Sequence, residues 1–375
     1  MDAQQLIQTI RPMVAAGEVP GAVVGVLHDG TSSLAAVGRT DPGGATAMSV
    51  DAVMRISSNT KPMIAAVALL LVQDGVLRLD DAVERFIPEL ADRRVLRQLD
   101  GRLEDTVPAH RTMTVEDLLT MRMGFGFVFE SACPAVDEAA AAGLGFGPPD
   151  PPAMPSADEW VARFAALPLL EQPGTVWRYE VAFGVLGVVL ARATGKSLDV
   201  LMKERLFDPL AMSRTGFATR HHLVPSFAQG ESGLVLLDSA VGGRWSKAPA
   251  FPDARGGLVS TGGDLLRFAG MLLDDGGGLL SPRWVAAMTS DRLTAEQRSS
   301  PSAHAFLDGG GWGYGVGVTD GARGRRYGWG GGLGTLWYSW PGHDAAAVLM
   351  TQVSPPSTRL FDAFTTAAEA TLDSS

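Results

Sequence analysis

The tetrad Ser58-Asn59-Thr60-Lys61 is the part of the sequence with the clearest potential for chemistry. Residues three apart on a helix lie one above the other, so the hydroxyl of Ser58 and the amine of Lys61 can meet. A serine hydroxyl is a weak nucleophile until a base takes its proton, and a buried lysine amine can be that base. A helix start would also offer backbone N–H groups to a developing oxyanion. We therefore interpret Ser58 as a nucleophile and Lys61 as its base.

This tetrad is unusual within the chain. The sequence holds four lysines, and only Lys61 follows a serine at this distance. The apolar run 63–72 comes directly after it and predicts a buried core helix. The competing interpretation is a surface helix whose N-terminus is capped by Ser57 or Ser58.

Composition excludes several other classes of protein. With 46% hydrophobic and 19% charged residues, the chain is expected to fold. Its net charge of −10 would repel phosphates, so we expect no nucleic-acid partner. The sequence holds one cysteine, no H-E-x-x-H pair and no glycine-rich phosphate loop. We therefore expect neither a bound metal nor a cofactor. The absence of G-x-S-x-G argues against an α/β-hydrolase.

The lack of a recognisable targeting signal favours a cytoplasmic location. The N-terminus has no basic segment followed by an apolar one, so no export signal is expected. The ten-residue apolar run 63–72 is about half of what a helix needs to cross a bilayer, so we expect no membrane insertion.

The helices and strands that must position the tetrad are predicted from the periodicity of apolar residues and from the places of Gly and Pro. Helices are predicted over residues 1–16, 115–121, 157–166, 183–193, 198–206, 261–273 and 359–372. Strands are predicted over residues 22–27, 34–37, 313–318, 326–329, 335–340 and 345–351.

Strands near both termini, with helices between them, predict a two-domain arrangement. Residues 1–57 and 240–375 would form an α/β domain with an antiparallel sheet and terminal helices. Residues 58–239 would form a mainly helical domain, with the active site at the interface. The segment 125–155, rich in Ala, Gly and Pro, is predicted to be a flexible loop or lid.

The motifs together resemble the serine β-lactamase and penicillin-binding-protein superfamily, for which S-x-x-K is a signature. The closer match is the class C-like branch, which includes family VIII carboxylesterases and D-amino-acid peptidases. The matching blocks occur in the family's order over nearly the whole chain: residues 19–22, 55–62, 77–81, 114–121, 173–175 and 256–261. The resemblance implies the β-lactamase/transpeptidase-like fold, α/β plus all-α, with an antiparallel sheet flanked by helices and an inserted helical domain.

The second family motif, Tyr-x-Asn, falls on Tyr179-Glu180-Val181, so the tyrosine is kept and the asparagine is not. The resemblance implies that Tyr179 shares the role of general base and acid with Lys61. The competing interpretation is a tyrosine that anchors the following helix.

The third motif, usually Lys-Thr-Gly or His-x-Gly, corresponds to Trp329-Gly330-Gly331. By analogy with the family, the N–H of Gly332 would pair with that of Ser58 as the oxyanion hole. A glycine-rich hairpin turn is the competing interpretation. The missing lysine and asparagine remove the usual partners of a β-lactam, which favours an uncharged or apolar ester.

Aromatic residues near these motifs could line the substrate pocket. We expect Trp177, Trp329, Gly330, Gly331 and Phe125 to contact a small-molecule ester or acyl substrate. The sequence leaves the oligomeric state open.

The leading hypothesis is a carboxylesterase that works through an acyl-enzyme on Ser58. The alternatives with the same first step are an acyltransferase acting on a small metabolite, a D-amino-acid peptidase or amidase, and a β-lactamase. An alternative of another class is a non-catalytic penicillin-binding-like module.

Overall fold

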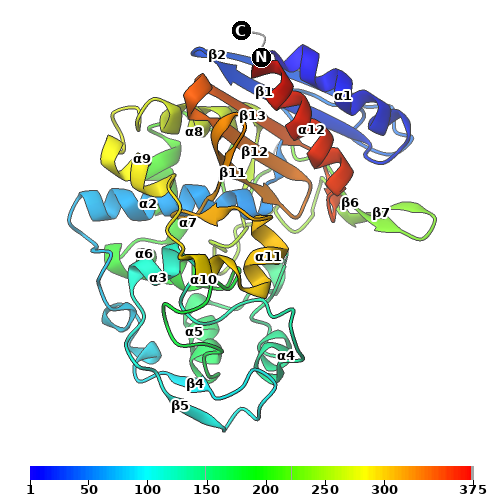
Figure 1. The fold of residues 1–375 in the computed structure, drawn as a ribbon. Coiled ribbons are helices and arrows are strands. Elements are labelled where there is room, and N and C mark those ends of the chain that lie inside the picture. The colour runs from blue at the N-terminus through cyan, green and yellow to red at the C-terminus, as the bar shows by residue number, and fades with distance from the viewer. Residues whose placement is uncertain (148, 221, 373–375) are drawn as a thin grey trace.

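The computed structural model describes residues 1–147, 149–220 and 222–372 (Figure 1). Its centre is a seven-stranded antiparallel sheet to which both ends of the chain contribute. The strand order is β2 (Thr31–Gly38), β1 (Gly21–His28), β13 (Ala345–Met350), β12 (Thr335–Trp340), β11 (Gly324–Gly331), β10 (Gly317–Gly321) and β9 (Gly311–Trp312). The predicted antiparallel sheet, with strands from both ends of the chain, is therefore present.

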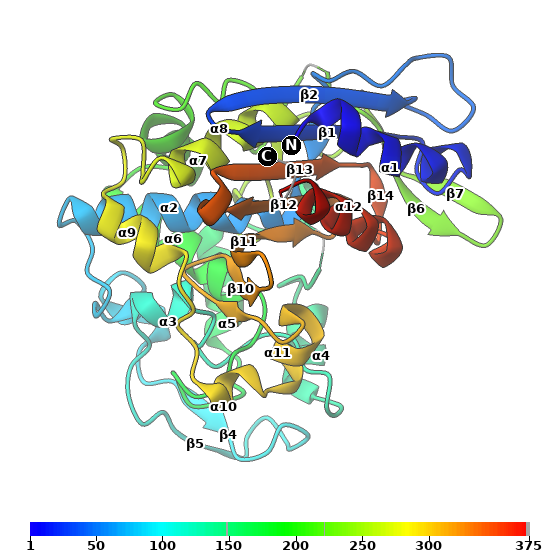
Figure 2. The same ribbon diagram turned by 45° about the horizontal axis from the view of Figure 1, so that its top comes forward.

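Both faces of this sheet are covered by helices (Figure 2). Helices α1 (Ala3–Ala15) and α12 (Thr358–Thr371) share one apolar core with Val24 and Leu349. Helices α2 (Thr60–Gln73) and α8 (Gly262–Leu273) share another with Val23 and Val348. Neighbouring strand residues point to opposite faces, so β1 and β13 are apolar on both sides.

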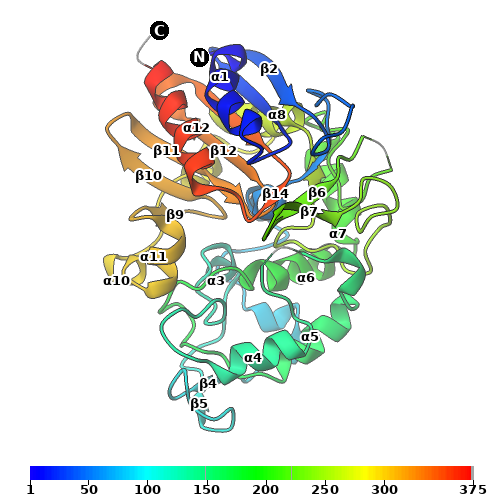
Figure 3. The same ribbon diagram turned by 90° about the vertical axis from the view of Figure 1, so that its right-hand side faces the viewer.

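Most of the remaining helices lie below the sheet in the view of Figure 3. They are α3 (Val115–Leu119), α4 (Pro134–Ala141), α5 (Ala157–Ala165), α6 (Ala182–Thr194), α7 (Leu198–Met202), α9 (Pro282–Met288), α10 (Ala295–Arg298) and α11 (Pro301–Leu307). Short strands pair as β4 (Arg94–Leu96) with β5 (Thr106–Pro108), β3 (Met54–Arg55) with β8 (Val259–Ser260), and β6 (Ser226–Gly230) with both β7 (Gly233–Asp238) and β14 (Val353–Ser354).

Division of the chain into domains 1–57 with 240–375 and 58–239 stays a prediction. Strand β14, near the C-terminus, pairs with β6, which lies within residues 58–239. This pairing therefore links the two predicted domains.

Two local predictions are wrong. The strand expected over residues 313–318 begins only at Gly317, because Gly315 turns with a φ of +78°. A Cβ at this position would lie 2.6 Å from the Cβ of Ala65, so the chain approaches α2 there as only glycine allows. The segment 125–155 is not all loop, since it contains α4, in which Ala135 and Ala139 are buried.

The predicted core helix after the tetrad is confirmed as α2. Every residue from Thr60 to Leu71 is buried, including the charged Lys61. A helix that is buried all round, with a lysine in its first turn, gives that lysine only protein groups as partners. Among the helices of the described chain, none has the length and apolar character to cross a bilayer.

We expect Leu69→Ala to lower the free energy of unfolding by about 3 kcal/mol, because the side chain lies 0% exposed in α2 and its loss leaves a cavity. Urea titration followed by tryptophan fluorescence measures the change. The control is Val76→Ala, 40% exposed, which should change it by less than about 0.5 kcal/mol. Equal effects of the two substitutions would contradict the packing of α2.

Candidate active site

A tight turn at the end of β3 presents Ser58. Residues Ser57–Asn59 form one 3₁₀ turn that runs into α2. The Ile56 N–H donates to the Leu258 carbonyl at 3.0 Å, which fixes the entry to the turn. Ser57 has a φ of +46°, a conformation that is strained for a residue with a side chain. Ser58, which follows it, is 7% exposed.

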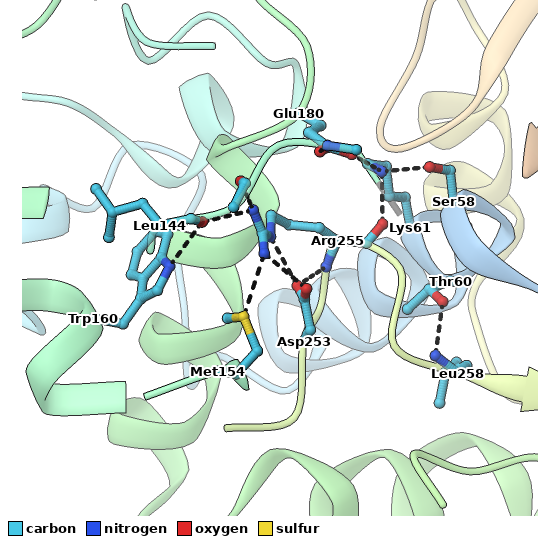
Figure 4. A network of polar contacts seen from close by, with 12 residues as sticks. Ser58, Thr60, Lys61, Leu144, Met154, Trp160, Glu180, Asp253, Arg255 and Leu258 are labelled. Atoms are coloured by element: carbon cyan, nitrogen blue, oxygen red, sulfur yellow. Dashed lines mark hydrogen bonds and ion pairs between the residues drawn. The ribbon is translucent and has the colours of Figure 1, made fainter. Parts of the chain in front are cut away.

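The structure brings Ser58 and Lys61 together. Lys61 Nζ donates to Ser58 Oγ at 2.8 Å (Figure 4). Asn59 is the residue at the N-cap of α2, with no side-chain capping bond, so the competing interpretation of Ser57 or Ser58 as a helix cap does not describe this turn.

Three acceptors surround the amine of Lys61. Besides Ser58 Oγ, they are the carbonyl of Arg255 at 2.6 Å and Glu180 Oε2 at 3.3 Å. An ammonium has three donors, so each N–H has one partner. Burying a charged group is costly unless it is paired and hydrogen-bonded, and this arrangement meets both conditions.

A buried ion pair supports the residue that supplies the carbonyl. Arg255 Nε and Nη2 donate to the two oxygens of Asp253 at 2.9 and 2.8 Å. Burial opposes ionisation of Asp253, but the Arg255 guanidinium outweighs it and holds the pKa of this carboxyl below its ordinary value. Arg255 Nη1 also donates to the carbonyls of Leu144 and Gly145, which attaches the segment 144–147 to the site (Figure 4).

Tyr179 lies beside Lys61, but it presents its ring and not its hydroxyl. Lys61 Nζ is 4.5 Å from the ring centroid, within the range of a cation–π contact. The hydroxyl accepts a hydrogen bond of 2.7 Å from the indole N–H of Trp329. The ring also packs on Phe306, with centroids 4.2 Å apart. The structure thus joins the second and third motifs directly, while the catalytic role of Tyr179 stays a prediction.

The hairpin of β11 and β12 is fastened to the turn that holds Ser58. Thr335 Oγ1 donates to the Ile56 carbonyl at 3.0 Å and accepts from Asn59 Nδ2 at 3.0 Å. A Cβ on Gly331 would overlap the Ile56 carbonyl oxygen, so this close approach requires glycine. Gly332 comes directly after the end of β11, close in sequence to these contacts; its part in an oxyanion hole stays a prediction.

The residues predicted to contact the substrate are buried to different extents. Trp329 is 9% exposed, whereas Trp177 is fully buried with its ring against Tyr179. Phe125 is also buried and packs on Phe164. Contact of Trp177 or Phe125 with a substrate would therefore require the side chains around them to move. The half-buried Phe127 stacks near Tyr179.

Glu180 is the functional candidate that sequence reasoning missed. The signal was present, because it is a carboxylate placed between Tyr179 and the apolar Val181. No group of three His, Cys, Asp or Glu side chains that could hold a metal occurs within residues 1–147, 149–220 and 222–372.

Comparisons with known proteins identify the family of this chain. A family model described as Beta-lactamase matches residues 6–372. Protein Rv1367c of Mycobacterium tuberculosis is 36% identical over 348 residues, 89% of this chain and 83% of that protein. Esterase EstB of Burkholderia gladioli is 29% identical, over 72% of this chain and 67% of its own.

A solved structure shows the same fold. EstCE1, described as a hydrolase with promiscuous acyltransferase activity, superposes with a TM-score of 0.84 at 22% identity and covers 98% of each chain. The predicted family resemblance and β-lactamase/transpeptidase-like fold are confirmed.

We expect Asp253→Asn to lower the free energy of unfolding at pH 7 by about 3 kcal/mol, because it leaves Arg255 buried without its counter-charge. The lowered pKa of Asp253 means that its ionised form stabilises the fold above the ordinary value of 3.8. This contribution is lost as the pH falls through the folded pKa. The difference between wild type and variant should therefore shrink in acid.

Urea titrations at pH 7 and pH 3 measure this difference. The control is Asp80→Asn, which removes an exposed partner of Arg78 and should leave the unfolding midpoint unchanged at pH 7. A deficit in Asp253→Asn of equal size at both pH values would contradict the assignment.

Proposed function

This chain is a serine-hydrolase-type member of the β-lactamase family, and from that premise we propose that it cleaves carboxylic esters through an acyl-enzyme on Ser58. The observation that carries the proposal is the 2.8 Å contact between Ser58 Oγ and Lys61 Nζ at the buried start of α2. A nucleophile and a base in hydrogen-bond contact, with the base held by further groups, is the arrangement that nucleophilic catalysis requires.

In the proposed acylation, Ser58 Oγ attacks the ester carbonyl carbon while its proton moves to Lys61 Nζ. The C=O electron pair becomes an oxyanion, which the N–H groups of Ser58 and Gly332 would hold. When the oxyanion collapses, the C–O bond to the alcohol breaks. The proton on Lys61 passes to the leaving alkoxide, with Tyr179 as the second proton carrier. Water then attacks the acyl-enzyme by the same steps, and the acid is released.

The preference for an ester rests on two side chains. At the position of the family's cationic lysine stands Trp329, whose indole N–H is engaged by Tyr179. A neutral donor that is already bonded offers no charge to a β-lactam carboxylate. At the position of the asparagine stands Val181, which is buried and has no amide to bind a substrate amide. The name of the relative EstB, an esterase, supports the same choice.

Acyl transfer is the second candidate function. EstCE1 is described as having promiscuous acyltransferase activity, and it shares this fold along the whole chain. The acylation step is common to both functions, so they differ only in whether water or another alcohol attacks the acyl-enzyme.

We expect Ser58→Ala to lower the rate of p-nitrophenyl ester hydrolysis by about 10⁴-fold or more, because no nucleophile remains to be acylated. Steady-state assays with short- and medium-chain esters measure this, beside a chromogenic cephalosporin that should be cleaved poorly. The control is Ser32→Ala, an exposed serine on β2, which should keep wild-type rates. Preferred cleavage of the cephalosporin would instead indicate a β-lactamase, and ester turnover retained in Ser58→Ala would end the proposal.

A primary alcohol added to the same assay separates the two functions. For an esterase, we expect the free acid to remain the main product at millimolar alcohol. An acyltransferase would give a new ester in proportion to the alcohol concentration, measured by chromatography. Neither product from the wild type, with a D-amino-acid amide hydrolysed instead, would indicate the amidase alternative.

A further inference from the structure

Glu180 lies beside the lysine of the site (Figure 4). Its side chain is 4% exposed. Glu180 Oε2 lies 3.3 Å from Lys61 Nζ, and Glu180 Oε1 accepts from the Gly147 N–H at 2.7 Å. Each carboxylate oxygen therefore has a donor, one charged and one from the backbone. A buried carboxylate needs such partners, so its position here reflects a specific pairing and not chance proximity.

The other groups in direct contact with Lys61 carry no negative charge. Ser58 presents a hydroxyl and Arg255 a backbone carbonyl. Tyr179 presents its ring, since its hydroxyl is bonded to Trp329. The nearby acid Asp253 forms its ion pair with Arg255. Glu180 is thus the carboxylate in direct contact with the amine.

We propose that Glu180 is a positioning residue that aims Lys61 Nζ at Ser58 Oγ and stabilises the ammonium formed when Lys61 takes the serine proton. In this step the Ser58 O–H bond breaks and an N–H bond forms on Lys61, and Glu180 takes no proton. The ammonium later gives the proton to the leaving alkoxide. This inference rests on the proposed function, because it concerns the same acylation step.

The same carboxylate connects the base to the segment 144–147. Glu180 binds the Gly147 N–H, and Arg255, whose carbonyl holds Lys61, binds the carbonyls of Leu144 and Gly145. The residues that supply two of the three acceptors around Lys61, Glu180 and Arg255, therefore both bind the segment 144–147. The orientation of the base depends on that segment being in place.

Glu180→Gln tests the proposal, because it keeps the shape and removes the charge. Neutral Lys61 is the form that accepts the serine proton, and a carboxylate at 3.3 Å favours the ammonium. Without that charge, the acidic limb of the pH–rate profile should move to lower pH by about one unit. Because Lys61 Nζ would be held less firmly toward Ser58 Oγ, the rate at the plateau of the pH–rate profile should fall by about tenfold or more.

The readout is the rate at which a fluorophosphonate labels Ser58 between pH 5 and pH 10, which needs no natural substrate. The matched control is Glu171→Gln, which removes a carboxylate from Arg178 that Glu130 still pairs. Its profile should superpose on that of the wild type. Glu180→Asp keeps the charge but moves it away from Lys61. We therefore expect a lower plateau than in the wild type, and a smaller shift of the acidic limb than in Glu180→Gln.

A folded Glu180→Gln whose acidic limb and plateau match the wild type would overturn this inference alone. If circular dichroism shows that this variant does not fold, Glu180→Asp decides the question, and an unchanged limb and plateau would overturn the inference. Absence of Ser58 labelling in the wild type at every pH would overturn the proposed function and this inference with it.

Discussion

A lysine amine that lies wholly inside the protein, in contact with a serine hydroxyl, is the constraint on which the rest of this structure depends. The interior offers no water to an amine at this depth, so protein groups must satisfy its donors. The Arg255 carbonyl and Glu180 do so from parts of the chain 194 and 119 residues away from Lys61. The fold therefore has to bring two distant segments to the first turn of one helix, and the site can form only when it does.

The sheet and α2 meet this requirement by holding the turn of Ser58 from several directions. The strained Ser57 persists because its neighbours are fixed, Ile56 by Leu258 and by Thr335 on β12. Thr335 belongs to a central hairpin of the sheet, so the position of the nucleophile is tied to the main core of the protein. Rigid elements of this kind keep reacting groups within the narrow range of geometry that catalysis needs.

An aromatic layer gives the site its chemical character. Phe306, Trp312 and Trp329 each contact Tyr179, with ring centroids between 4.2 and 6.4 Å apart. The indole N–H of Trp329 donates to the Tyr179 hydroxyl, and that of Trp312 donates to the Leu119 carbonyl. An environment of this kind favours the apolar parts of a substrate, while the charge stays concentrated around Lys61.

The sequence by itself determined the local relationships. The spacing of Ser58 and Lys61, the apolar run of α2 and the glycines after Trp329 predicted the serine–lysine contact, the buried helix and the family. These features follow from helix pitch, strand alternation and short motifs, which depend on near neighbours in the chain. Only the tertiary structure decided that Glu180 contacts the base, because packing between remote segments is not encoded in any local period.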